Sequence, residues 1–222
     1  MTTESLDVRF YAPDRRTSVD IADLLRYCGR TFDLTGDDPS STRSLGPDAV
    51  DELPSVIPLE DAIERVSSGR HGALWFREQN IEFGLHIHPD IDDPATFTVS
   101  VPDHYVRSSQ KKNVCSVIDD IVIPLYEYAT PMFVYGGTYL DDHILSREHI
   151  ESGCIDRAFW LLVFGPQLVE TLGKERLAGL SASRFSELSD GGRLVLLTDT
   201  PNTCAEVQRA DAETVLQEGC GP

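Results

Sequence analysis

The sequence predicts an α+β fold: a mixed, mostly antiparallel β-sheet with helices packed on one face. Short apolar runs of strand length alternate with segments whose apolar residues recur at three- and four-residue steps, as on one side of a helix. Turn signals at 79–80 and 189–192 each join two strand-like runs, which favours antiparallel pairing. With 222 residues and 41% hydrophobic content the chain can bury a normal core, so we expect one domain over 1–222. Two βαββ-like halves, 1–130 and 131–222, also fit the order of elements.

The N-terminal part predicts one strand and two helices around a polar stretch. The run 8–12 has strand character, and the apolar pattern over 19–28 indicates a one-sided helix with Ser18 at its N-terminal cap. Residues 36–54 are rich in Pro, Gly, Ser and Asp, so we expect a long surface excursion there. Residues 58–68 then predict a short amphipathic helix.

The middle of the chain predicts three strands followed by a helix. The strands are expected at 72–78, 81–88 and 95–102, the first two joined by a tight turn. Apolar residues at helical spacing over 113–129 predict the helix, and Pro124 inside it predicts a kink or an early end.

The C-terminal part predicts a sheet segment with one strongly buried strand. A strand is expected at 132–139, and the polar segment 141–152 has weak helical character. The nearly all-apolar run 158–164 indicates a buried central strand, after which Pro166 suits the first turn of a helix over 167–177. The sequence then predicts a hairpin, and last a helix; these segments are 184–188, 193–198 and the tail from 203.

The charge balance predicts adaptation to molar salt. The chain carries 37 Asp and Glu against 19 Lys and Arg, for a net charge of -18, and three of the basic residues are lysines. Short carboxylates hold water and cations near the chain, and at about 1 M salt a Debye length of ~3 Å screens their mutual repulsion. We therefore expect a cytoplasmic protein of an extreme halophile. Such a surface disfavours binding to nucleic acid or to anionic membranes, and it suits either salt adaptation alone or a basic protein partner.

Two histidines form the best metal-like pattern. His86 and His88 would point to the same face of a strand, with acidic residues directly after them. His104 or His71 could supply a third ligand, as a zinc site requires. The alternative is a solvent-facing strand in an acidic protein. A metal-dependent hydrolase using His86 and His88 is therefore one functional hypothesis.

No complete catalytic motif is present, and we expect no cofactor. The sequence has no G-x-S-x-G elbow, no phosphate-binding loop and no dinucleotide fingerprint. Asp141 and Asp142 could line a cleft, and Tyr135 and Tyr139 share one face of the expected strand 132–139. Aromatic side chains dominate both cores and interfaces, so these four residues are the candidate binding residues if they prove accessible.

Motifs within residues 130–201 resemble the Immunity protein 52 type of family, small α+β antidotes of polymorphic toxin systems. The matching features are a tyrosine–glycine strand, a W-x-x-x-F-G-P strand–helix junction, a G-x-E-R-L helix end and a GG-x-L-x-L hairpin. The matched residues all have structural character; they are Trp160, Phe164, Gly165, Pro166, Gly173, Gly191 and Gly192.

This resemblance implies a non-enzymatic protein that binds a partner, such as a toxin, and it implies no catalytic residue. The alternatives are the metal-dependent hydrolase and a structural or self-assembling domain.

Overall fold

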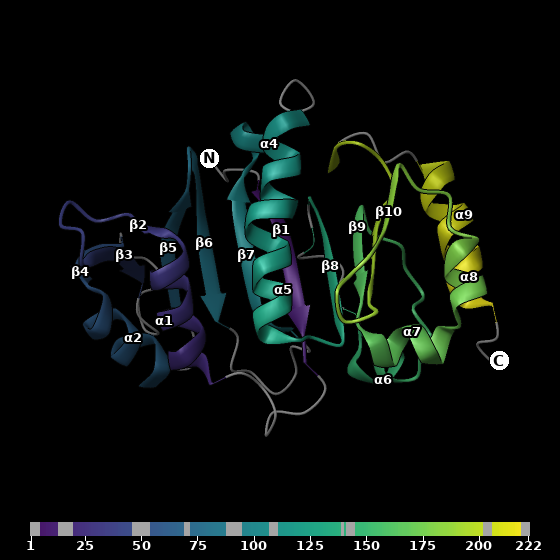
Figure 1. The fold of residues 1–222 in the computed structure, drawn as a ribbon, viewed down its shortest axis with the longest axis horizontal. Helices are drawn as coiled ribbons and strands as arrows, with labels where there is room; N and C mark the ends of the chain where they lie inside the picture. Colours follow the sequence, from purple (N-terminus) through teal and green to yellow (C-terminus); the bar gives the residue numbers. More distant parts are fainter. Residues whose placement is uncertain are drawn as a thin grey trace.

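The computed structural model describes residues 5–12, 20–45, 54–68, 72–87, 95–106, 111–138, 140, 145–201 and 206–218 (Figure 1). The tail helix lies at one end of a wide sheet, and the first two helices lie at the other. No helix in these ranges is both long and apolar enough to cross a membrane.

In the part of the chain that the structure describes, one antiparallel sheet of eleven strands runs through the molecule. The strands are β1 (Ser5–Tyr11), β2 (Asp33–Leu34), β3 (Ser41–Leu45), β4 (Ser55–Pro58), β5 (Gly72–Glu78), β6 (Ile81–Ile87), β7 (Ala95–Pro102), β8 (Phe133–Thr138), β9 (Leu161–Phe164), β10 (Arg184–Glu187) and β11 (Arg193–Leu196). Their order is β10-β11-β9-β8-β1-β7-β6-β5-β3-β4, with β2 paired to β5. The strand pairs within these ranges are all antiparallel. The predicted α+β class is therefore confirmed, and the described sheet has none of the parallel pairs that a mixed sheet would contain.

The first strand occupies the middle of this sheet. β1 pairs with β7 along one edge, for example Val8 with Val99, and with β8 along the other, for example Val8 with Gly136. Strands before residue 103 therefore lie on one side of β1 and strands after residue 132 on the other. The N-terminal strand joins the two parts of the chain into one sheet.

Ten helical segments accompany the sheet within the ranges given above. They are α1 (Ile21–Thr31), α2 (Leu59–Ser68), α3 (Asp103–Val106), α4 (Lys111–Ser116), the π-helical η1 (Val117–Val122), α5 (Ile123–Ala129), α6 (Arg147–Glu151), α7 (Pro166–Leu172), α8 (Lys174–Ala178) and α9 (Glu206–Gln217).

Two hydrophobic cores lie on opposite faces of the sheet. In β9, Leu161 and Val163 pack into a first core with α1, α2 and the continuous rod of α4, η1 and α5, which we call the α4–α5 rod. Leu162 and Phe164 point the other way and pack into a second core with α6 to α9. The expectation of helices on one face alone is wrong for this part of the sheet. The nearly continuous apolar run 158–164 is the sequence of a strand covered on both sides.

The expected polar excursion at 36–54 contains a strand. Residues 41–45 form β3, which pairs with β4 and β5, and Ser41, Thr42 and Ser44 are buried. The Thr42 hydroxyl donates a hydrogen bond to the carbonyl oxygen of Trp75, so burial leaves that hydroxyl satisfied. Polar composition hid this strand because buried hydroxyls such as those of Ser41 and Thr42 find backbone partners. Residues 46–53 lie outside the described ranges.

The helix predicted over 113–129 continues past Pro124. Its irregularity is the π-helical η1, which ends directly before α5, and the N–H of Ile123 donates to the carbonyl of Ile118. Proline cannot donate a hydrogen bond, and a shift to five-residue spacing beside it lets the rod continue without a break. The helix ends at Thr130, which adopts the left-handed conformation with φ 44°.

Other helix boundaries follow local chemistry. The carboxylate of Asp20 caps α1 by accepting from the N–H groups of Ala22 and Asp23, whereas the expected cap, Ser18, lies outside the described ranges. Pro166 opens α7 as predicted. Gly173, with φ 86°, divides the helix expected over 167–177 into α7 and α8.

The hairpin turn between β10 and β11 is tied to the α4–α5 rod. The carboxylate of Asp190 accepts from the N–H of Gly192 at 2.8 Å and from the hydroxyl of the buried Tyr126 at 2.7 Å. Burial and the neighbouring carboxylate raise the pKa of Tyr126 above its ordinary value. This contact fixes the far edge of the sheet against the rod.

Replacing Gly165 with alanine should destabilise the protein, because the backbone closes around this residue. A Cβ at Gly165 would lie 2.6 Å from the carbonyl oxygen of Pro131 and 3.0 Å from that of Met132, and backbone atoms cannot move aside as a side chain can. We expect the free energy of unfolding to fall by about 1–3 kcal/mol, measured by denaturant titration.

Gly137→Ala is the matched control. A Cβ at Gly137 meets only the Leu140 side chain, at 3.4 Å, an ordinary contact. We expect this variant to change stability by less than about 1 kcal/mol. Equal losses in the two variants would show that the close approach at Gly165 does not constrain the fold.

Candidate functional site

Among the described residues, no helix covers one face of the sheet over part of its width. Strands β1, β7, β6 and β5 turn alternate residues into the first core, and their other residues form what we call the open face. The helices of the described chain contribute their apolar residues to the first and second cores and form no core on this face. The open face is made of Asp7, Arg9, Arg43, Trp75, Glu82, Gly84, His86, Thr98 and Ser100.

The strand register aligns these side chains in two rows across the sheet. In one row Asp7 pairs with Ser100, Ser100 with Gly84, and Gly84 with Trp75. In the neighbouring row Arg9 pairs with Thr98 and Thr98 with His86. Residues that are far apart in sequence thus form one polar and aromatic surface.

Gly84 lets two aromatic rings converge. A Cβ at this position would lie 2.9 Å from Nε2 of His86 and 3.3 Å from Nε1 of Trp75. The two rings meet edge to face, with centroids 5.9 Å apart. Two ring nitrogens that can hydrogen-bond are therefore held side by side over bare backbone.

A cation borders this aromatic pair. The guanidinium of Arg43 lies 5.6 Å from the ring centroid of Trp75 and forms an ion pair with Glu82. Burial, with a smaller contribution from the charge of Arg77, lowers the pKa of Arg43. The ordinary pKa of arginine is so high that the guanidinium remains charged at neutral pH. Arg43, Trp75 and His86 thus form a half-exposed cluster with charge, aromatic surface and hydrogen-bonding groups.

The part of the open face nearest β1 is a polar network. The carboxylate of Asp7 accepts hydrogen bonds from the hydroxyls of Ser100 at 2.6 Å and Ser5 at 3.0 Å. Arg9 and Thr98 are buried beside it. These groups are held in place and give the surface a defined pattern of donors and acceptors.

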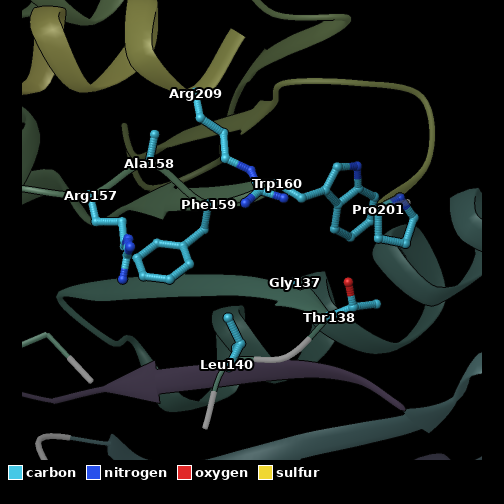
Figure 2. A pocket seen from close by; sticks show the side chains of 9 residues that line it. All are labelled: Gly137, Thr138, Leu140, Arg157, Ala158, Phe159, Trp160, Pro201 and Arg209. Carbon is cyan, nitrogen blue, oxygen red and sulfur yellow. The ribbon is translucent and has the colours of Figure 1, made fainter. Parts of the chain in front are cut away.

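A separate small hollow, open to solvent, lies where β8 ends and the chain enters β9 (Figure 2). Two arginines, Arg157 and Arg209, stand on one side, and the end of β8 forms the other. The remaining lining is largely apolar: Gly137, Thr138, Leu140, Ala158, Phe159, Trp160 and Pro201.

The predicted binding residues fall partly within the described chain. Tyr135 is fully buried in the second core, with its ring centroid 4.6 Å from that of Phe159 and 5.6 Å from that of Phe133. In this conformation Tyr135 has no surface for a partner. Tyr139, Asp141 and Asp142 lie outside the described ranges, and their binding role stays a prediction.

One of the two predicted metal ligands lies within the described ranges. His86 lies on the open face against Trp75, and His88 lies outside the described ranges. Within the ranges that the structure describes, no group of three His, Cys, Asp or Glu side chains could hold a metal ion. Metal binding by His86 and His88 stays a prediction.

Titratable groups with shifted pKa values lie at structural contacts. Burial and the carboxylate of Glu151, which accepts from the Tyr11 hydroxyl at 2.6 Å, raise the pKa of Tyr11. Burial raises the pKa of the Cys28 thiol, so this cysteine stays protonated in the first core. These groups hold elements together, and no nucleophile with an adjacent base accompanies them in the described chain.

Comparison with known proteins identifies a shared fold. The Pseudomonas aeruginosa T6SS protein PA0821 matches 96% of this chain over 72% of its own length, with a TM-score of 0.57 and 12% sequence identity. No family model and no curated protein matches the sequence. The chain therefore shares the architecture of a T6SS protein at very low sequence similarity.

Sequence reasoning missed the Trp75 cluster, although a signal was present. In the strand 72–78, Leu74 and Phe76 point to one face, and Trp75 and Arg77 must then point to the other. A tryptophan that shares the polar face of a strand with an arginine is an interface signal. Arg43 could not be found in this way, because its strand was not predicted.

The two tryptophans should differ in access to solvent. Trp160 is buried and its indole N–H donates to the carbonyl of Thr198 at 2.8 Å, whereas Trp75 is half-exposed. In Trp160→Phe protein, the remaining Trp75 emission should be quenched by acrylamide several-fold more efficiently than the Trp160 emission of Trp75→Phe protein. Equal quenching constants in the two folded variants would show that Trp75 is covered.

Proposed function

We propose that this protein is a non-enzymatic, immunity-like protein that binds and blocks a protein partner, such as a toxin, through its open face. The observation that carries the proposal is the half-exposed cluster of Arg43, Trp75 and His86 on a sheet face without a helix. Two further features support it: the fold shared with a T6SS protein and the motifs at 130–201 that resemble the Immunity protein 52 family.

The chemistry of the open face suits recognition of a protein. Tryptophan and arginine are over-represented among the residues that contribute most to binding energy, and they do so at the centre of an interface. Trp75 is held by its strand and by Arg43, so it would lose little conformational freedom when a partner covers it. The ion pair between Arg43 and Glu82 positions the guanidinium beside the ring.

The size of the open face suits the central part of an interface. Five neighbouring strands, β1, β7, β6, β5 and β3, span four inter-strand spacings, or about 19 Å. A standard interface buries roughly 800 Å² on each partner. The strands would thus supply the centre of the contact, with surrounding loops as its rim.

We further propose that the complex forms in the cytoplasm of a halophile. The net charge of -18 would then serve to keep the protein soluble in molar salt. The same salt would screen long-range attraction to a basic partner. Affinity would depend on close contacts such as those of Trp75, which salt screens little.

The proposal is tested with a toxin-domain protein encoded beside this gene. Isothermal titration calorimetry in multimolar KCl should detect a stoichiometric complex, and Trp75→Ala should weaken it by about 30-fold, the effect of removing a central contact of about 2 kcal/mol. Arg43→Ala should weaken binding by about 10-fold.

Glu170→Ala on α7, exposed and far from the open face, is the control and should bind as the parent does. Absence of a complex at both low and high salt would overturn the proposal. Stoichiometric zinc in the purified protein, lost in His86→Ala, would instead support the metal hypothesis.

A further inference from the structure

We propose that the hollow between the end of β8 and α9 is a binding site for a ligand that carries a carboxylate on an apolar or aromatic body. Arg157 and Arg209 would bind the carboxylate, and Phe159 and Trp160 would contact the body. This inference is independent of the proposed function, because none of these residues belongs to the open face.

Three segments distant in sequence build the hollow. Gly137 and Thr138 come from the end of β8, residues 157–160 lead into β9, and Arg209 comes from α9. Figure 2 shows both arginines and both aromatic rings on one side, with Thr138 and Leu140 opposite them. The ligand would lie between these two sides.

The charge state of the hollow is unexpected for this chain. Acidic residues outnumber basic ones by 37 to 19, and arginines elsewhere find carboxylates, such as Arg184 with Asp119 and Arg193 with Glu187. Within the described ranges, neither Arg157 nor Arg209 forms an ion pair or a hydrogen bond. Two guanidinium groups without an ion pair in the described chain thus line one hollow and would attract an anion, while the Glu213 carboxylate there accepts from the backbone N–H of Ala158.

The lining favours a carboxylate with an apolar body over a bare anion. Guanidinium groups present planar, paired donors that match the two oxygens of a carboxylate. The rest of the wall offers aromatic rings, Leu140, Ala158 and Pro201, which a small inorganic ion would leave uncovered. The Trp160 indole N–H is already used by Thr198, so its ring contributes apolar surface alone.

The site can also discriminate by a hydrogen bond. The hydroxyl of Thr138 faces the hollow from the end of β8 (Figure 2) and makes no other hydrogen bond within the described chain. It can donate to a carboxylate oxygen that the arginines already hold. The walls of the hollow thus supply two positive charges and one neutral donor.

Phenylacetate is the probe, because it joins a carboxylate to one aromatic ring. Titration followed by ¹H–¹⁵N NMR should shift the indole signal of Trp160 and leave that of Trp75 unchanged, with a Kd of about 1 mM, as a ten-atom ligand can reach. The neutral isostere phenylacetamide should bind at least about 10-fold more weakly, because it lacks the charge.

Variants of the two arginines test whether the probe binds in the hollow. Arg157→Gln/Arg209→Gln should weaken phenylacetate binding at least about 10-fold, whereas Arg26→Gln, which removes an arginine on α1 that pairs with Glu60, should leave it unchanged. Both arginines of the double variant are exposed, so its Tm should stay close to that of the parent.

Two further ligands identify the source of the group. A peptide ending in phenylalanine with a free carboxylate, compared with the same peptide amidated, tests whether a chain terminus can supply it, and tighter binding than phenylacetate would assign the site to a chain terminus. Phenyl phosphate binding more tightly than any carboxylate would overturn the ligand class. No shift of the Trp160 signal by any probe, or equal binding by the double variant, would overturn the site.

Discussion

The fold depends on the position of β1 between β7 and β8. Pairs such as Val8 with Val99 and Val8 with Gly136 place this strand at the only junction between the strands before residue 103 and those after residue 132 in the described sheet. Its apolar residues, Leu6, Val8 and Phe10, all enter the first core, and Tyr11 at its end joins the second. Gly136 opposite Val8 keeps the neighbouring strand close, because a Cβ there would meet Val8 at 3.1 Å. One strand thus connects both cores and both parts of the sheet.

The two parts of the sheet are covered differently, and that difference creates the candidate sites. Strands β8, β9 and β11 lie between two helical layers, so their side chains are used for packing. Strands β5, β6 and β7 pack against helices on one face, and their other face holds buried and half-buried polar and aromatic groups in fixed register. The open face and the arginine-lined hollow lie in these two different environments, one a broad surface and the other a recess at a strand end.

Much of this architecture follows from sequence pattern. Strands 72–78 and 95–102, the hairpin at 184–196 and the opening of α7 at Pro166 were all predictable from alternation and turn chemistry. Two features were not. The strand β3 has the composition of a loop because Ser41, Thr42 and Ser44 are polar yet buried, and composition alone does not reveal the backbone partners of Ser41 and Thr42. The second helical layer was missed because the sequence predicts helices such as 167–177 but does not specify which face of the sheet they cover. The Trp75 and Arg157 sites depend on long-range register, which local pattern does not specify.

The central location of β1 also sets an order of events during synthesis. Tyr11 pairs with Phe133 on β8, which is 122 residues later in the chain (133 − 11), so this pair cannot form until Phe133 has been synthesised. At about 5–20 residues per second, translation alone imposes a delay of roughly 6–24 s before that edge of β1 is closed. During this interval a hydrophobic strand edge remains available to other chains, which is the situation that chaperones relieve. A growing chain of this kind is therefore expected to need such protection until β8 has left the ribosome.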